Sequence, residues 1–288
     1  MKDKIKKFSV LKIILTLFLI CFSILLYARF IGTSGIKVKE YKIEYELLPD
    51  YFHGLKIIHL SDIHYGNIIN DKRLKEIVDK INFINPDIVV LTGDLIDKDF
   101  PLTNENIKNI SAILSSINVS IDKYAIRGNH DYFFEEWEQI IQNSDFKNLD
   151  NTFDYIYKDG YSPILIAGLS SISDKVPFIE RYEQLQKEIN NQNQNGIYQI
   201  LLLHEPDPIK NINLKDYNLV LAGHSHNGQI RLPLVGAIVK AEFAEKYYDE
   251  YYKIQNTDLY ISSGIGTSGL DLRLFNRPSF NFYRLTNK

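Results

Sequence analysis

One long apolar run near the N-terminus stands apart from the shorter apolar runs of the rest of the chain. Residues 8–28 read FSVLKIILTLFLICFSILLYA, and Lys12 is their only charged residue. At 1.5 Å per residue these residues form about 30 Å of helix, the thickness of the hydrocarbon core of a bilayer. Polar side chains do not gather on one face, as they do in a soluble amphipathic helix. The pattern therefore predicts one transmembrane helix.

A cleaved signal peptide is the alternative interpretation of this segment. The apolar run is longer than the usual core of a signal peptide, and no A-x-A site follows it. A lipoprotein signal is disfavoured because Ile20 stands directly before Cys21, where a small residue is expected. The sequence favours an uncleaved anchor.

The distribution of charge around the apolar run predicts its orientation. Lysines crowd the residues before it, at positions 2, 4, 6 and 7, whereas Arg29 stands almost alone after it. By the positive-inside rule, the helix is a single-pass anchor in the cell membrane, with the N-terminus in the cytoplasm and the body on the extracytoplasmic side. A body on the cytoplasmic face is the alternative. About ten residues with a Gly-Thr-Ser-Gly hinge lead to the first predicted strand at Val38, and they span at most ~35 Å.

The body contains five short apolar runs, each of which ends in polar residues. The runs are 56–61, 88–92, 124–127, 200–203 and 219–222. Runs this continuously apolar predict strands that are buried on both faces. Helical spacing predicts helices over 72–82, 104–117 and 178–192. An Asn/Gln stretch over 190–196 predicts a solvated loop, and the chain after Gly228 is β-like.

Composition narrows the class of protein. The chain has 288 residues, 45% of them hydrophobic, and neither an internal repeat nor a Pro/Ser-rich linker divides the body, which favours one α/β sandwich domain. A single cysteine excludes an intramolecular disulfide and a cysteine metal cluster. Residues 1–30 carry six basic and one acidic side chain, which leaves 27 basic and 35 acidic side chains in the remainder. An acidic body disfavours nucleic acid as a partner, and no obligate protein partner is indicated.

Polar side chains with metal-binding chemistry follow each of the five predicted strands. They are Asp62, His64, Asp94, Asn129, His130, Asp131, His204, His224 and His226. Taken singly, each has an ordinary alternative as a cap or turn residue, but turns do not favour histidine. Ligands of α/β sheets bind beyond the carboxyl ends of the strands. Imidazole, carboxylate and amide groups without thiolate suit Mn, Fe or Zn, and two such ions can clamp a displacement at phosphorus.

In this order the blocks D-x-H, G-D, G-N-H-D, a lone His and G-H-x-H resemble the calcineurin-like metallophosphoesterase family. The phrases GLKIIHLSDIHYG, PDIVVLTGDLID, AIRGNHDY, LLLHEPD and LAGHSHNGQIRLP and the tail GIGTSGLDLRLFNRPSF resemble its membrane-associated bacterial branch, which includes UDP-2,3-diacylglucosamine pyrophosphatase-like phosphohydrolases. The resemblance implies a four-layer αββα sandwich over 53–288. Before it we expect the cytoplasmic tip and transmembrane helix over 1–30, and a tether with the first strand over 31–52.

The resemblance also implies a role for each of these residues. Asp62, His64 and His226 would hold one divalent metal ion, and Asn129, His204 and His224 would hold a second. Asp94 would bridge the two ions together with a hydroxide. His130 would protonate or stabilise the leaving oxygen, and Asp131 would orient His130, with a hydrogen-bonded loop carboxylate as the alternative for Asp131.

One further motif resembles a different family of sites. Residues 264–269 match the dinucleotide fingerprint G-x-G-x-x-G, which requires a helix and a second strand after it. Pro278 follows nine residues later, so we expect a loop beside the metal site, with Arg273 as a candidate contact for substrate phosphate.

The sequence thus predicts a membrane-anchored, metal-dependent hydrolase of phosphoester or pyrophosphate bonds. The expected partners are the lipid bilayer and a phosphorylated, lipid-linked or envelope substrate. UDP-2,3-diacylglucosamine, a lipid A precursor, is the named candidate, although it is cytoplasmic and conflicts with the predicted orientation. The alternatives are a phosphodiesterase or nucleotidase of soluble substrates and a non-catalytic metal-binding scaffold.

Overall fold

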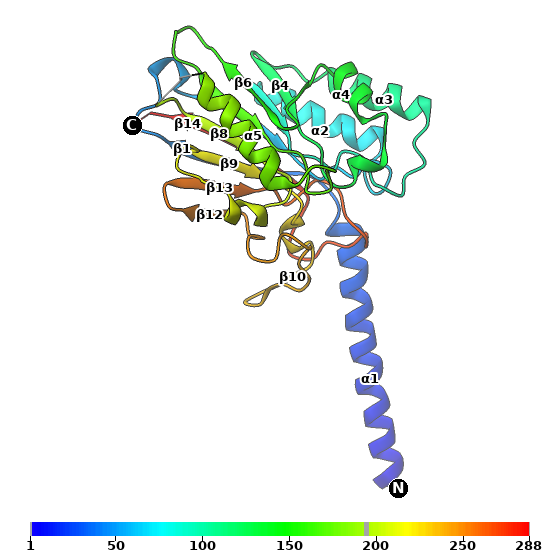
Figure 1. The fold of residues 1–288 in the computed structure, drawn as a ribbon. Helices are drawn as coiled ribbons and strands as arrows, with labels where there is room; N and C mark the ends of the chain where they lie inside the picture. The colour runs from blue at the N-terminus through cyan, green and yellow to red at the C-terminus, as the bar shows by residue number, and fades with distance from the viewer. Residues whose placement is uncertain (1, 193–195, 288) are drawn as a thin grey trace.

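A long N-terminal helix stands on a layered α/β body in the computed structural model, which describes residues 2–192 and 196–287 (Figure 1). Helix α1 spans Lys2–Leu26 and continues as one π-helical turn, Tyr27–Ile31. The apolar span Ser9–Ile31 is long enough to cross a membrane by length and composition. The helix that the apolar run predicts is therefore present.

The junction between α1 and the body is packed, whereas the sequence suggested a hinge. Arg273 N donates to Ala28 O at 3.0 Å, and the guanidinium of Arg73 donates to Thr33 O at 2.8 Å. Gly32 has room for no side chain, because a Cβ there would meet the carbonyl of Arg273. The residues between helix and strand thus lie against the body.

Strands of the first sheet follow the order β1-β14-β2-β3-β4-β5. Their bounds are β1 Lys37–Glu44, β14 Ser279–Thr286, β2 Leu55–Leu60, β3 Ile88–Leu91, β4 Asp122–Ala125 and β5 Lys147–Asn148. Strands β2 to β5 are parallel to one another. Strand β14 is antiparallel to β2 and parallel to β1, so these two strands run in the opposite direction.

The second sheet has the order β12-β13-β9-β8-β7-β6. Its strands are β12 Tyr251–Ile254, β13 Thr257–Ile261, β9 Leu219–Ala222, β8 Gln199–Leu202, β7 Ile164–Gly168 and β6 Thr152–Ile156. Its four central strands are parallel, and the two edge strands are antiparallel to their neighbours. Two short strands, β10 Arg231–Leu232 and β11 Gly236–Ala237, form a separate hairpin.

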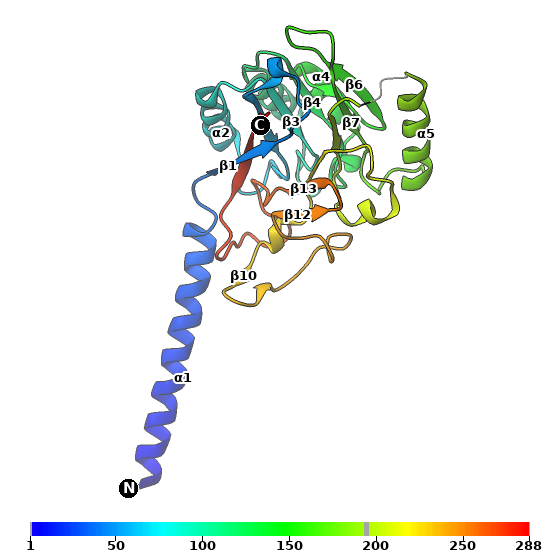
Figure 2. The same cartoon turned by 90° about the vertical axis from the view of Figure 1, so that its left-hand side faces the viewer.

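Helices cover the outer faces of both sheets (Figures 1 and 2). Helices α2 (Asp71–Ile84), α3 (Asn104–Ser115) and α4 (Trp137–Asn143) cover the first sheet, and α5 (Phe178–Asn191) covers the second. Short 3-10 turns span Asp50–Phe52, Asp131–Phe133, Asp207–Asn211 and His226–Gly228. Apolar side chains on alternate faces of the strands fill three cores, one between the sheets and one under each helical layer. This arrangement confirms the four-layer αββα sandwich.

Two loop predictions have different outcomes. The Asn/Gln stretch begins inside α5, which continues to Asn191, and residues 193–195 of that stretch lie outside the described residues. The G-x-G-x-x-G match is a loop between β13 and β14 and not the start of a helix, as expected.

The strand directions decide where α1 leaves the body. The carboxyl ends of β2, β3 and β4 meet at one edge of the first sheet, and the amino ends of β1 and β14 meet at the same edge because these strands run the other way. Since α1 leads directly into β1, the helix emerges at the edge where ligands of α/β sheets bind.

The inter-sheet core should contribute strongly to the stability of the body. Ile166 is fully buried there, and Ile166→Ala should lower the free energy of unfolding by about 2–5 kcal/mol. The measurement is unfolding by urea in detergent, monitored through the fluorescence of Trp137. This is the single tryptophan, and it is buried in the body. Phe83→Ala, at an exposed position of α2, is the control and should change stability by about 0.5 kcal/mol or less. Equal losses for both variants would contradict the assignment of the core.

Candidate metal centre

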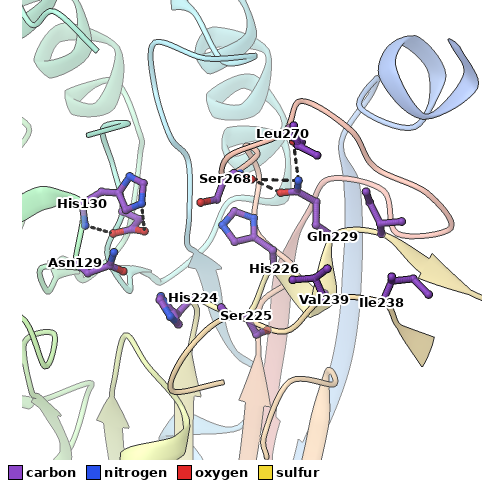
Figure 3. A pocket seen from close by; sticks show the side chains of 14 residues that line it. Asn129, His130, His224, Ser225, His226, Gln229, Ile238, Val239, Ser268 and Leu270 are labelled. Atoms are coloured by element: carbon purple, nitrogen blue, oxygen red, sulfur yellow. Dashed lines mark hydrogen bonds and ion pairs between the residues drawn. The ribbon is translucent and has the colours of Figure 1, made fainter. Parts of the chain in front are cut away.

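The predicted ligands come from the carboxyl ends of strands in both sheets. Asp62 and His64 follow β2, Asp94 follows β3 and Asn129 follows β4 in the first sheet. The second sheet contributes its histidines from the loops after β8 and β9, at positions 204, 224 and 226. Asn129 and His130 face His224 and His226 across one cavity (Figure 3).

The first group of ligand atoms is close enough to hold one ion. Asp62, His64 and His226 each offer a ligand atom within 4.8 Å of the others. Nε2 of His64 lies 3.0 Å from Nε2 of His226, and the latter atom lies 3.5 Å from Oδ1 of Asp62. Ligand atoms about 2.1 Å from a shared ion are about 3.0–3.4 Å apart at tetrahedral or octahedral angles, so the spacing fits a metal ion.

A second group lies on the side of the second sheet. Nε2 of His204 lies 3.0 Å from Oδ1 of Asn129 and 3.3 Å from Nδ1 of His224. Asp94 connects the two groups: its Oδ2 is 3.6 Å from Nε2 of His64, and its Oδ1 is 3.4 Å from Nε2 of His204. A carboxylate with one oxygen toward each group is placed to bridge two ions.

Backbone carbonyls fix the tautomers of two of these histidines. Nδ1 of His204 donates to Thr92 O at 2.7 Å, and Nε2 of His224 donates to Glu242 O at 2.8 Å. A carbonyl can only accept, so in the neutral form of each ring the proton lies on this nitrogen and the opposite nitrogen, which faces the site, has the lone pair. Outer-shell partners of this kind are typical of metal-ligating histidines. Burial by itself lowers the pKa of His204, but Asp94 outweighs it and raises that pKa well above its ordinary value, so metal binding there would release a proton.

Burial and neighbouring charges set the protonation of the remaining groups. Burial by itself raises the pKa of Asp94, but His204, His64 and His130 outweigh it and hold that pKa well below its usual value. Burial, His64 and Arg273 together lower the pKa of His226 well below its ordinary range. An ionised bridging carboxylate and a neutral imidazole are the forms that bind metal.

Five of the seven predicted ligands have a left-handed backbone. They are Asp62 (φ 52°), His64 (φ 45°), Asp94 (φ 54°), His224 (φ 64°) and His226 (φ 45°). For a residue with a side chain this conformation is uncommon and costs about 1–2 kcal/mol. Strain of this kind persists where the surroundings impose it, and it clusters at functional sites.

The glycines of the G-D and G-N-H-D motifs let two loops touch. A Cβ on Gly128 would lie 2.4 Å from the backbone nitrogen of Asp94, and a Cβ on Gly93 would lie 2.3 Å from the backbone nitrogen of Gly128. Gly93 also has φ 92°, which favours glycine. These two positions explain why each motif begins with a residue that lacks a side chain.

Asp131 holds these two loops together and does not contact the ring of His130. Its buried carboxylate accepts from the backbone N–H groups of Asp94 at 2.8 Å, Leu95 at 2.9 Å and Gly128 at 2.9 Å. The geometry corresponds to the alternative expectation, a hydrogen-bonded loop carboxylate. Burial, with the charge of Asp94, raises the pKa of Asp131 to about 7.

The group that orients His130 is the backbone of Lys98, which donates to Nδ1 at 3.1 Å. Because Nδ1 accepts, the ring proton of neutral His130 lies on Nε2. Burial lowers the pKa of His130 to about 4, which keeps the ring neutral.

Asp97 is a second residue that the sequence motifs did not identify: its Oδ2 lies 3.4 Å from Nδ1 of His64. Its position three residues after Asp94 in the same loop is the sequence feature that could have identified it.

Arg273 is fully buried and its guanidinium is committed to backbone carbonyls. It donates to Ser263 O at 2.8 Å and to Gly266 O at 2.6 Å, and it lies 3.3 Å from Nδ1 of His226. These contacts hold the 263–269 loop against the metal site. They favour a structural role over the contact with substrate phosphate suggested by the sequence.

A cavity of about 380 Å³ opens beside the two ligand groups. One side of it is polar and includes Asp94, Asn129, His130, His224 and His226. Another part of the lining is apolar and includes Ile230, Ile238, Val239, Ala241 and Leu270. The cavity can therefore receive a group with a charged end and an apolar end.

Comparison with known proteins agrees with this geometry. The sequence model of the family described as calcineurin-like phosphoesterase matches residues 55–228, a range that contains all seven predicted ligands. The chain belongs to the calcineurin-like phosphoesterase family. As a member of this metallophosphoesterase family it is a metal-dependent phosphoester hydrolase, and its histidine and aspartate groups are compatible with a binuclear site for divalent ions.

Relatives of this phosphoesterase occur in bacteria and animals. It is 31% identical over 274 residues to an uncharacterized metallophosphoesterase of Campylobacter jejuni, which covers 92% of this chain and 68% of the relative. It is 29% identical over 267 residues to an uncharacterized metallophosphoesterase of Bacillus subtilis, with 90% and 88% covered. A transmembrane protein with metallophosphoesterase domain from Danio rerio is 29% identical over 251 residues, 84% of this chain but 55% of that protein. The chain thus spans about half the length of the fish protein.

Replacement of the bridging carboxylate should remove metal from this phosphoesterase. Asp94→Asn keeps the size of the side chain but removes the charge that faces both ligand groups, so the purified variant should hold much less Mn or Zn than the unmodified chain. The measurement is elemental analysis of protein after equilibration with each ion and gel filtration. Asp99→Asn, in the same loop but exposed, is the matched control and should keep its metal. Full metal content in Asp94→Asn would exclude a bridging role.

Proposed function

We propose that this phosphoesterase is anchored in a membrane by α1 and hydrolyses a phosphoester or pyrophosphate bond on a lipid-linked substrate. The observation that carries the proposal is the position of the half-apolar cavity. It adjoins the metal ligands at the edge of the sheets from which α1 emerges. A lipid phosphate presents a charged group and an apolar group to the same site.

The apolar wall distinguishes this substrate class from small soluble phosphates. Ile238, Val239 and Leu270 line the cavity, and each also remains exposed to solvent. A substrate that consists only of a phosphate and a polar group would gain little from such a wall, whereas burial of apolar surface contributes about 25 cal/mol per Å². An acyl or prenyl chain beside the phosphate fits both sides of the cavity.

The residues of the chain supply binding and hydrogen-bond donation in this mechanism. Two divalent ions, when bound, supply an activated nucleophile and stabilise the charge that develops at phosphorus. Asp94 lies between the two groups of ligands, with one carboxylate oxygen toward each group. His130 carries its proton on Nε2, because Nδ1 accepts from the backbone of Lys98, and Nε2 can donate to a phosphate or leaving oxygen in the cavity that His130 lines.

His130 should therefore matter for turnover and little for metal binding. His130→Ala should lower the rate on bis(p-nitrophenyl) phosphate by about 10²–10⁴, the usual size of an acid–base contribution, and should keep the metal content. Rate and metal content are measured on the same preparation. His53→Ala, at an exposed histidine before β2, is the control with full activity. A wild-type rate in His130→Ala would exclude its assigned role.

Chemically matched pairs of substrates test the lipid part of the proposal. In phospholipid vesicles the full chain should cleave CDP-diacylglycerol faster than CDP-glycerol, and UDP-2,3-diacylglucosamine faster than UDP-N-acetylglucosamine. Burial of two methylene groups at about 0.8 kcal/mol each corresponds to about tenfold in kcat/KM. Equal kcat/KM within both pairs would exclude a lipid-linked substrate and favour the alternative, a phosphodiesterase or nucleotidase of soluble substrates.

The orientation of the anchor decides between the named candidate and other lipids. The lysines before α1 favour a cytoplasmic N-terminus and a body outside the membrane, whereas UDP-2,3-diacylglucosamine is cytoplasmic. Protease added to intact spheroplasts should therefore degrade the body, as detected with an antibody against the C-terminal residues. Complete protection in intact spheroplasts, with degradation after lysis, would reverse the orientation and strengthen the case for the UDP-sugar lipid.

A further inference from the structure

We propose that residues 232–239, which run from the last residue of β10 through β11 to the two residues after it, insert into the membrane surface as a second contact beside α1. This segment is called the apolar hairpin below. The inference rests on the proposed anchoring of this phosphoesterase by α1, and it identifies the surface through which a lipid substrate would enter the site.

The apolar hairpin exposes large side chains that nothing in the described chain covers. It reads LPLVGAIV and contains no charged residue. Relative exposure is 108% for Leu234, 69% for Val235 and 73% for Val239. Soluble proteins rarely expose contiguous apolar patches, and those that occur mark sites of protein or membrane contact. The exposure therefore indicates a partner.

The tip of the hairpin is held in an unfavourable conformation for a leucine. Only two residue pairs join β10 to β11, Arg231 with Ala237 and Leu232 with Gly236. Leu234 lies at the turn between them with φ 66°, a left-handed value that favours glycine, asparagine or aspartate. In water, neither the backbone nor the side chain of Leu234 is stabilised by this position. In a membrane, burial of the side chain in lipid would stabilise it.

The position of the hairpin favours a bilayer as the partner. Figures 1 and 2 both show β10 projecting from the end of the body at which α1 emerges, on the side toward which the helix extends. The loop before β14 joins the two features: Arg273 N donates to Ala28 O at the end of the helix, and Leu270 of the same loop lines the cavity with Ile238 and Val239. A membrane around α1 thus lies on the side of the hairpin.

One pair of residues beside the apolar hairpin has the chemistry of a membrane interface. Lys240 comes directly after it, is exposed, and lies 3.8 Å from the ring centroid of Tyr248. Tyrosine and lysine are typical of the boundary between lipid chains and headgroups. Since Ile238 and Val239 also form the cavity wall, insertion would join the apolar wall of the metal site to the interior of the leaflet.

Quenching by brominated lipid tests the insertion directly. The full-length L234W variant is placed in vesicles of phosphatidylcholine and phosphatidylglycerol, with phosphatidylcholine brominated on its acyl chains as the quencher. The matched control is Y161W, because Tyr161 has 102% relative exposure and lies in the β6–β7 loop at the opposite end of the sheet. The buried Trp137 is a common background. We expect strong quenching for L234W and none beyond background for Y161W.

Equal quenching of the two variants would overturn the inference. Fluorescence of L234W that shifts to the blue without quenching, and that depends on the ratio of protein to lipid, would instead identify a second copy of the chain as the partner and would also overturn it.

A second experiment separates this inference from the proposed function. Because both side chains are exposed, the double variant Leu234→Asp, Val235→Asp should keep the fold intact. The double variant should lose about tenfold in kcat/KM on CDP-diacylglycerol in vesicles, the equivalent of about 1.4 kcal/mol, and should keep its kcat/KM on CDP-glycerol. If the unmodified chain prefers the lipid but the variant does not lose that preference, only the hairpin inference fails. If the unmodified chain shows no preference while L234W is quenched, the lipid substrate fails and the membrane contact remains.

Discussion

The backbone at the strand ends is the constraint on which the site depends. Five of the seven predicted metal ligands hold left-handed conformations, and side chains leave the strands toward one point only because the chain turns this sharply. Each such residue costs about 1–2 kcal/mol, so folding must offset a large local penalty. The packing of the fully buried strands that precede these residues offsets the penalty, because it leaves the backbone at the strand ends no freedom to relax.

Hydrogen bonds to Asp131 and contacts at two glycines transmit this constraint between neighbouring loops. The carboxylate of Asp131 ties the loop after β3 to the loop after β4 through three backbone N–H groups. Gly93 and Gly128 allow these loops to approach within a distance that excludes any side chain. Residues of the motifs that do not face the cavity are therefore as necessary for the geometry as the ligands, and Arg273 acts in the same way on the 263–269 loop.

The five strands that precede the ligands could be predicted, because continuous apolar runs and polar strand ends are local signals. The four layers and the division of the ligands into two groups followed only from the resemblance to the family, and strands β6 and β7 were not predicted. The packed junction at Gly32 could not be predicted, since its partner, the loop around Arg273, lies some 240 residues later in the sequence. The roles of Asp131 and Arg273 were also inaccessible: the residue types allow a catalytic contact or a structural one, and only the placement of backbone groups from other loops decides between them. The contact of Lys98 with His130 involves a backbone N–H, which every residue except proline offers, so no side-chain pattern marks it.

The packed junction between α1 and the body has a consequence for rotational freedom. A catalytic domain on a flexible linker tumbles and presents its mouth in every direction. Here the backbone bond from Arg273 to Ala28, the ion pair of Arg29 with Asp271 at 3.4 Å and the bond from Arg73 to Thr33 remove that freedom. The angle between the helix axis and the mouth of the cavity is set by the chain itself, so a helix that stands across a bilayer would present the mouth to the leaflet at every encounter.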